Sequence, residues 1–157
     1  MAQNFEFEFL VQKFLVENGV TFLAPQFQLI YDKELDSGGS NPDFVAIRPS
    51  WSEIFVVEVS VSGNLNRLVE KTRDRERQWL RALRQTLTAK RIINDDWRIE
   101  VLAFIRQDQM AWFTSAIGQA ADVHVWPIEF TLEPWRWPAE VRDATFDLRN
   151  TALCNRR

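Results

Sequence analysis

Cysteine and histidine are almost absent from this sequence, and their scarcity narrows the chemistry that the chain can perform. Of 157 residues, Cys154 is the one cysteine and His124 the one histidine. A lone cysteine excludes an internal disulfide framework and a thiolate zinc site, which favours a reducing, cytoplasmic location. His124 lies in the strand-like stretch DVHVWPI, far along the chain from Ser60 and Ser62. A nucleophilic triad is therefore not supported, and a structural role is expected for His124.

Long apolar runs and glycine motifs that bind phosphates are also absent. No stretch reaches the roughly 18 apolar residues of a transmembrane helix, and the N-terminus MAQNFEFEFL lacks the basic and apolar segments of a secretory signal. The five glycines form no phosphate-binding or dinucleotide motif. A hydrophobic content of 46% and a charged content of 26% are ordinary for a globular protein. We therefore expect one soluble domain over 1–157, with no membrane association.

Hydrophobic periodicity predicts alternating helices and strands along the chain. The predicted helices cover 4–18, 64–87, 109–120 and 139–148. The predicted strands cover 21–31, 44–48, 53–62, 97–105 and 122–128. This order is αβββαβ over about 4–105, followed by an added αβ and a C-terminal extension over 106–157. It predicts an α/β fold with a mixed central β-sheet flanked by helices.

The predicted helix over 64–87 combines an inner apolar stripe with a basic outer surface. The stripe comprises Leu65, Leu68, Val69, Thr72, Glu76, Trp79, Leu80, Leu83 and Leu87. The segment 67–91 contains nine basic residues and three acidic ones, Glu70, Asp74 and Glu76. In a chain of net charge −3, such a helix favours contact with a polyanion. The alternative is a solvated helix with ion pairs such as Glu70–Arg73 and Asp74–Arg77.

Two carboxylates interrupt the apolar stretch NPDFVAIRPSWSEIFVVEVSVSG at 41–63. Asp43 follows Pro42 at the start of one apolar run, and Glu58 lies in the middle of the next. Two adjacent strands could present both side chains toward one point, where their negative charges would repel. A divalent cation that prefers oxygen ligands relieves this repulsion, and Mg²⁺ suits two carboxylates best. The alternative is that Glu58 faces solvent and Asp43 caps a turn.

The pattern Pro42-Asp43, fourteen residues, Glu58-Val59-Ser60 resembles the PD-(D/E)XK nuclease superfamily, which has the restriction-endonuclease-like fold. The core order αβββαβ of that family covers 4–105 here. The resemblance implies that Asp43 and Glu58 bind Mg²⁺ or Mn²⁺, with the carbonyl of Val59 as a further ligand. It also implies a phosphodiester substrate. A glutamate of the first helix often completes such sites, which implies Glu8, although a solvated glutamate at a helix start is the alternative.

Ser60 stands where the family usually has a lysine, which is credited with supporting the attacking water and developing negative charge. Lys71 is a candidate replacement. The strand extends about 13 Å beyond Glu58, and the following helix returns about 12 Å before it reaches Lys71. Gln78 lies on the same helix flank, and some family members carry their lysine or a glutamine on this helix. The alternative is that Lys71 is only a border lysine of the apolar stripe.

The sequence therefore predicts a metal-dependent endonuclease that hydrolyses phosphodiester bonds of nucleic acid, with DNA as the expected substrate. Lys71, Ser60 and Gln78 are expected to assist catalysis. Four arginines are expected to contact backbone phosphates: Arg67, Arg73, Arg75 and Arg77. A homodimer would let so small a domain address both strands.

Two other functions fit the sequence. The first is a catalytically inactive nuclease-like fold that binds nucleic acid or a protein, the latter through Trp135 and Trp137 unless these tryptophans cover the sheet. The second is an α/β enzyme with a deep pocket for a small phosphorylated or acidic ligand. Trp51 and Trp112 are candidates for base stacking.

Overall fold

The computed structural model of the chain describes residues 2–17, 19, 22–29, 40–137 and 146–155. The helices are α1 (Ala2–Glu17), α2 (Asn66–Arg73), α3 (Arg81–Ala89), α4 (Met110–Ile117) and α5 (Ile128–Thr131). The strands are β1 (Phe22–Pro25), β2 (Phe44–Arg48), β3 (Glu53–Ser60), β4 (Arg98–Ile105) and β5 (Val123–Pro127). Within these described ranges, no helix has the length and apolar character needed to cross a bilayer.

The strands form one five-stranded mixed sheet in the order β1-β2-β3-β4-β5. Strand β2 runs antiparallel to both of its neighbours, β1 and β3, and β4 and β5 run parallel to β3. Parallel neighbours need a crossover connection, which the helices α2 and α3 supply after β3 and α4 supplies after β4. The predicted α/β class, with a mixed sheet flanked by helices, is confirmed.

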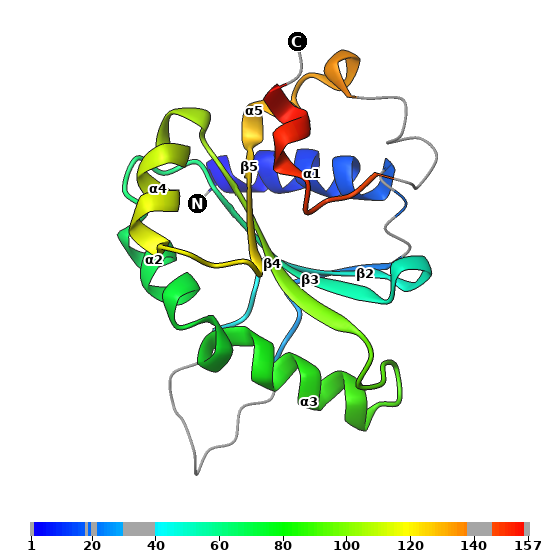
Figure 1. Cartoon of the computed structure of the whole chain (residues 1–157). Coiled ribbons are helices and arrows are strands. Elements are labelled where there is room, and N and C mark those ends of the chain that lie inside the picture. The colour runs from blue at the N-terminus through cyan, green and yellow to red at the C-terminus, as the bar shows by residue number, and fades with distance from the viewer. Residues whose placement is uncertain (1, 18, 20–21, 30–39, 138–145, 156–157) are drawn as a thin grey trace.

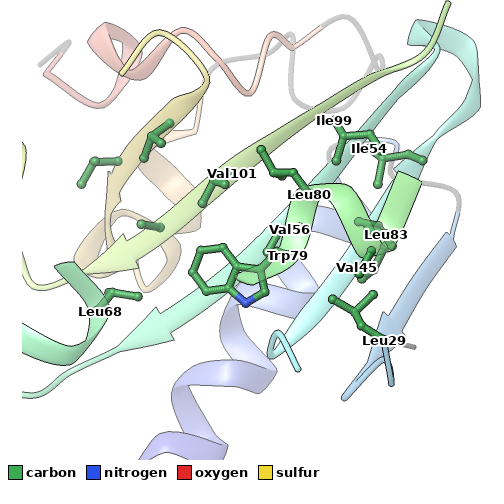
Figure 2. Packing of buried hydrophobic residues seen from close by; sticks show 14 of the residues in the cluster. Leu29, Val45, Ile54, Val56, Leu68, Trp79, Leu80, Leu83, Ile99 and Val101 are labelled. Carbon is green, nitrogen blue, oxygen red and sulfur yellow. The ribbon is translucent and has the colours of Figure 1, made fainter. Parts of the chain in front are cut away.

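Helices cover both faces of the sheet (Figure 1). The helices α2, α3 and α4 pack on the face that carries Ile54 and Val56. Helix α1 and the C-terminal segment pack on the face that carries Phe55 and Val57. Because both faces of β3 are covered, its sequence is a nearly continuous apolar run. Figure 2 shows side chains of the first cluster between helix and sheet, Trp79 among them.

An aromatic cluster centred on Phe14 joins α1 to the C-terminal part of the chain. Ring centroids of Trp126, Phe130, Trp137 and Phe146 lie 5.9, 5.7, 5.1 and 6.2 Å from that of Phe14. The indole N–H of Trp137 donates to the carbonyl of Phe130 at 2.7 Å. Trp137 therefore covers the sheet, whereas Trp135 remains 78% exposed.

The predicted long helix is interrupted, and one residue of its predicted stripe is wrong. Asp74 lies at a turn after α2, and a π-helical turn, η2 (Glu76–Leu80), precedes α3. A π-turn has more residues than an α-turn, so it shifts the residues after it around the helix. Glu76, the first residue of this turn, is exposed, whereas Gln78 and Trp79 within it are buried.

Two other predicted elements differ from the structure. The strand predicted over 21–31 ends at Pro25, because Gln26 has a φ of 50°, a left-handed conformation that does not continue a strand. The helix predicted over 139–148 lies mostly outside the described residues, and its last three residues, 146–148, are not helical.

Candidate active site

Two acidic side chains from neighbouring strands meet beyond the open end of the β2–β3 hairpin. Phe44 of β2 lies opposite Val57 of β3, so continuing the antiparallel register sets Asp43 opposite Glu58. Opposite residues in an antiparallel pair point to the same face, here the face that α2 covers. Asp43 and Glu58 line one cavity of about 320 Å³, which we call the carboxylate cavity. Its other lining residues are Val59, Ser60, Asn64, Arg67, Leu68 and Lys71.

A buried ion pair at the closed end of the same hairpin fixes this register. Arg48 and Glu53 lie opposite each other, are 0% and 1% exposed, and approach to 3.3 Å. The guanidinium of Arg48 also lies 4.1 Å from the ring centroid of Trp51. A slip of one residue would set Asp43 opposite a residue that points to the other face. It would also separate a buried pair of opposite charges, which is costly.

Backbone hydrogen bonds hold Asp43 in place. The backbone N–H of Val59 donates to the carboxylate of Asp43 at 2.8 Å, and the N–H of Gln26 donates to the backbone carbonyl of Asp43 at 2.8 Å. Burial raises the pKa of Asp43 above its ordinary value, and this effect is opposed by the Val59 N–H, by a hydrogen bond with Glu58 and by the charge of Lys71. The carboxylate is thus positioned by the strand backbone before any ligand binds.

Glu58 is the more strongly perturbed member of the pair. Its side chain is 7% exposed, and burial followed by the negative charge of Asp43 raises its pKa well above the ordinary value. A protonated Glu58 can donate its proton to Asp43, which accounts for the hydrogen bond between the two carboxyl groups. Its Oε1 atom is buried and has no hydrogen-bond partner among the described residues. A buried polar atom without a partner is unfavourable unless a ligand satisfies it.

Lys71 lies beside the two carboxylates. This is the position along the sheet that the rise per residue of the strand and of the following helix predicts. Lys71 belongs to α2, is half-buried and lines the carboxylate cavity. Its positive charge lowers the pKa of both Asp43 and Glu58. The cavity is therefore lined by two acids and two basic side chains, Lys71 and Arg67, and such clusters of opposite charge occur in catalytic sites.

Glu8 approaches the pair from α1. Its pKa is raised first by burial and then by the negative charge of Asp43, and its own charge raises the pKa of Glu58. Glu8 is not among the residues that line the carboxylate cavity. Nor does the described part of the chain contain a group of three Asp, Glu, His or Cys side chains that could hold one ion. Glu8 thus contributes to the site through its charge.

The two remaining candidate donors lie in different places. Ser60 lines the carboxylate cavity, where its hydroxyl accepts the N–H of Ser62 at 3.3 Å. Gln78 is buried in the π-turn, and its amide nitrogen lies 3.5 Å from the carboxylate of Asp74. Gln78 is not among the residues that line the carboxylate cavity.

The four candidate arginines divide into two pairs. Arg67 is exposed at the rim of the carboxylate cavity, and Arg73 is exposed elsewhere on α2. Arg75 donates two hydrogen bonds to Asp122, at 2.7 and 2.6 Å, and one to the carbonyl of Thr72. Arg77 pairs with Asp74 at 2.5 Å, as predicted. A phosphate would therefore have to compete with a carboxylate partner at Arg75 and Arg77, whereas Arg67 forms no ion pair with another described residue.

Asn64 lines the carboxylate cavity and was missed by sequence reasoning. It follows Ser60 and Ser62 in a series of turns in which each side-chain oxygen accepts the N–H two residues later. The spacing of Ser60, Ser62 and Asn64 is the signal in the sequence that could have indicated it.

Comparisons with protein-family models, curated proteins and solved structures give no match. The function is therefore inferred from the chemistry of the site.

Proposed function

We propose that the protein is a metal-dependent nuclease of the restriction-endonuclease-like, PD-(D/E)XK type that hydrolyses phosphodiester bonds of nucleic acid, DNA in the first instance. The order α1-β1-β2-β3-α2-β4, with three antiparallel strands followed by a parallel one, supports this assignment. The observation that carries the proposal is the convergence of Asp43, Glu58 and Lys71 in one cavity. A cavity of about 320 Å³ is at the lower limit of small-molecule pockets, so an extended phosphate chain suits it better than an enclosed metabolite.

The residues present fit a hard divalent cation. The donors are oxygen atoms, as Mg²⁺ and Mn²⁺ prefer, and the unpartnered Oε1 of Glu58 is an available ligand atom. Asp43 and Glu58 would hold the ion, with the carbonyl of Val59 as a further candidate, and Glu8 would act on the site through its charge. When bound, such an ion polarises a phosphoryl oxygen and lowers the pKa of a coordinated water.

The chain's own residues would divide the remaining tasks. The backbone N–H of Val59 keeps Asp43 oriented, so little reorganisation accompanies substrate binding. Lys71 supplies a fixed positive charge for the phosphate as negative charge develops on its oxygens, replacing the lysine that Ser60 lacks. Ser60 contributes a hydroxyl that can orient a water molecule. Arg67, at the rim, would contact a neighbouring phosphate and fix the register of the strand without reading its sequence.

Cleavage of a nucleic-acid panel tests the proposal. Purified protein is incubated with supercoiled, linear and single-stranded DNA and with RNA, in Mg²⁺, in Mn²⁺ and in chelator. Cleavage should require the divalent ion and should be lost in Asp43→Ala and Glu58→Ala. Cleavage that survives both substitutions would refute the proposed site.

A second function, nucleic-acid binding without catalysis, is favoured by Ser60 at the lysine position. Its hydroxyl carries no charge and already accepts the N–H of Ser62. This alternative predicts binding to nucleic acid without cleavage, and no heat of binding when Mg²⁺ is titrated into the protein. Calorimetric titration of the wild type against Asp43→Ala separates the two functions.

A further inference from the structure

A second cavity adjoins the carboxylate cavity. It has a volume of about 280 Å³ and is lined by Gly63, Asn64, Leu65, Asn66, Gln109 and Trp112. We call it the Trp112 cavity. It lies where the start of α2 meets the start of α4, two helices that lie side by side (Figure 1). Asn64 lines both cavities, so the two cavities are neighbours.

Trp112 presents an uncovered indole to this cavity. All seven tryptophans lie among the described residues, and Trp112 and Trp135 are the exposed ones, at 47% and 78%. By contrast, Trp79 and Trp126 are fully buried. An exposed indole at a cavity rim is a suitable surface for a planar ring, and stacking of a nucleobase on an aromatic side chain contributes about 1–3 kcal/mol.

The other lining groups suit the edge of a base. Asn64, Asn66 and Gln109 carry carboxamides, each of which can both donate and accept hydrogen bonds, as base edges do. None of the six described lining residues is acidic. The guanidinium of Arg106 lies close by, with Nη1 3.9 Å from where a β-carbon on Gly63 would be, and it pairs with the carboxylate of Asp108 at 2.5 Å. The cavity thus offers stacking and amide hydrogen bonding.

We propose that the Trp112 cavity is a nucleobase site that holds an unpaired base next to the phosphate bound at Asp43 and Glu58. This proposal rests on the proposed nuclease function for the identity of the neighbouring phosphate site. In a duplex, base faces are covered by their neighbours and cannot reach an indole without being extruded. The substrate is therefore single-stranded nucleic acid, or a duplex with an unpaired nucleotide at the cut.

Equilibrium binding in chelator tests the base site without cleavage. The probes are a fluorescently labelled single-stranded DNA of mixed sequence, its duplex, and the same single strand with abasic positions. Trp112→Ala should weaken single-strand binding roughly 5- to 150-fold, which is the stacking contribution converted to affinity. Trp112→Phe should retain most of the affinity, because a phenyl ring also stacks. Trp135→Ala is the matched control for loss of an exposed indole and should bind like the wild type.

The abasic probe separates base stacking from backbone contact. Wild type should bind it about as weakly as Trp112→Ala binds the intact strand, and Trp112→Ala should show no further loss. Duplex affinity should be the same in wild type and Trp112→Ala. The proposal is overturned if Trp112→Ala leaves single-strand affinity unchanged or weakens single strand and duplex equally.

The outcomes for the two sites are distinguishable. Loss of cleavage in Asp43→Ala together with normal single-strand binding by Trp112→Ala supports the nuclease and refutes the base site. Weakened single-strand binding by Trp112→Ala together with cleavage that survives in Asp43→Ala supports the base site and refutes the nuclease assignment.

Discussion

Replacing Glu58 with glutamine should stabilise the protein at neutral pH in the absence of divalent ions. Burial and the charge of Asp43 raise the pKa of Glu58, so ionising this carboxyl costs more in the folded chain than in the unfolded chain. Glutamine imitates the protonated acid, because its amide can donate to Asp43 but carries no charge. The variant therefore avoids the cost of ionisation while keeping the shape of the side chain.

The pH dependence has a definite sign. A raised folded-state pKa means that the wild type has its full stability below the ordinary value of 4.5 and loses stability as pH rises from there through the folded-state pKa. Each unit of difference corresponds to about 1.4 kcal/mol. For a chain of 157 residues this is a shift in Tm of about 3–6 °C per unit. The proton is shared with Asp43, so the measured pKa belongs to the pair.

Thermal unfolding followed by circular dichroism, in chelator and between about pH 4 and pH 8, measures the effect. The Tm of Glu58→Gln minus that of wild type should increase as pH rises. Saturating Mg²⁺ should then raise the Tm of wild type only, because a ligand at about 100 times its Kd stabilises by about 2.7 kcal/mol. A difference in Tm that stays constant with pH, or a variant that melts below wild type at pH 8, would refute the account of Glu58.

Four further perturbations test other parts of the structure. Lys71→Ala should lower the cleavage rate by roughly 10²- to 10³-fold in single-turnover assays, and an unchanged rate would remove Lys71 from the mechanism. Arg67→Ala should reduce the salt dependence of nucleic-acid binding by about one phosphate contact, measured from log Kd against log salt. Arg75→Ala should leave that slope unchanged but lower the free energy of unfolding by about 1 kcal/mol, because Arg75 holds Asp122; a changed slope would show that Arg75 contacts phosphate. Glu53→Ala should cost about 3–5 kcal/mol in urea unfolding, because it leaves Arg48 buried without its partner, and a loss below about 1 kcal/mol would show that the pair does not fix the hairpin.

The faces of the strands and the meeting of the two carboxylates could be predicted from sequence, because they depend on the regular repeat of residues along a strand or helix. Alternation in β2 and β3 sets which side chains share a face, and the rise per residue of strand and helix predicted that Lys71 returns to the level of Glu58. Both follow from backbone geometry, which changes little between proteins.

The features that were missed depend on contacts between distant segments. The π-turn at Glu76–Leu80 cannot be read from helical periodicity, which predicts Glu76 inside and Gln78 on the flank of Lys71. The backbone hydrogen bond from the N–H of Gln26 to the carbonyl of Asp43 forms directly after β1 ends. It joins two segments that are far apart in the sequence. Asn64 and Trp112 meet only because α2 packs beside α4. The sequence makes Trp112 a candidate for stacking on a base, but sequence alone does not place Trp112 beside the carboxylates.

The hairpin also determines where the chain can change length. Its arms comprise the pairs from Arg48–Glu53 to Phe44–Val57, and the residues that close it, 49–52, lie outside this ladder. Extra residues inserted in that closing turn do not change the number of residues from Asp43 to Arg48 or from Glu53 to Glu58. Asp43 and Glu58 therefore stay opposite each other. A single insertion within either arm produces a bulge and moves one acid away from the other by about 3.3 Å, more than metal coordination tolerates. Natural and engineered length variation should therefore concentrate in the closing turn and avoid the arms.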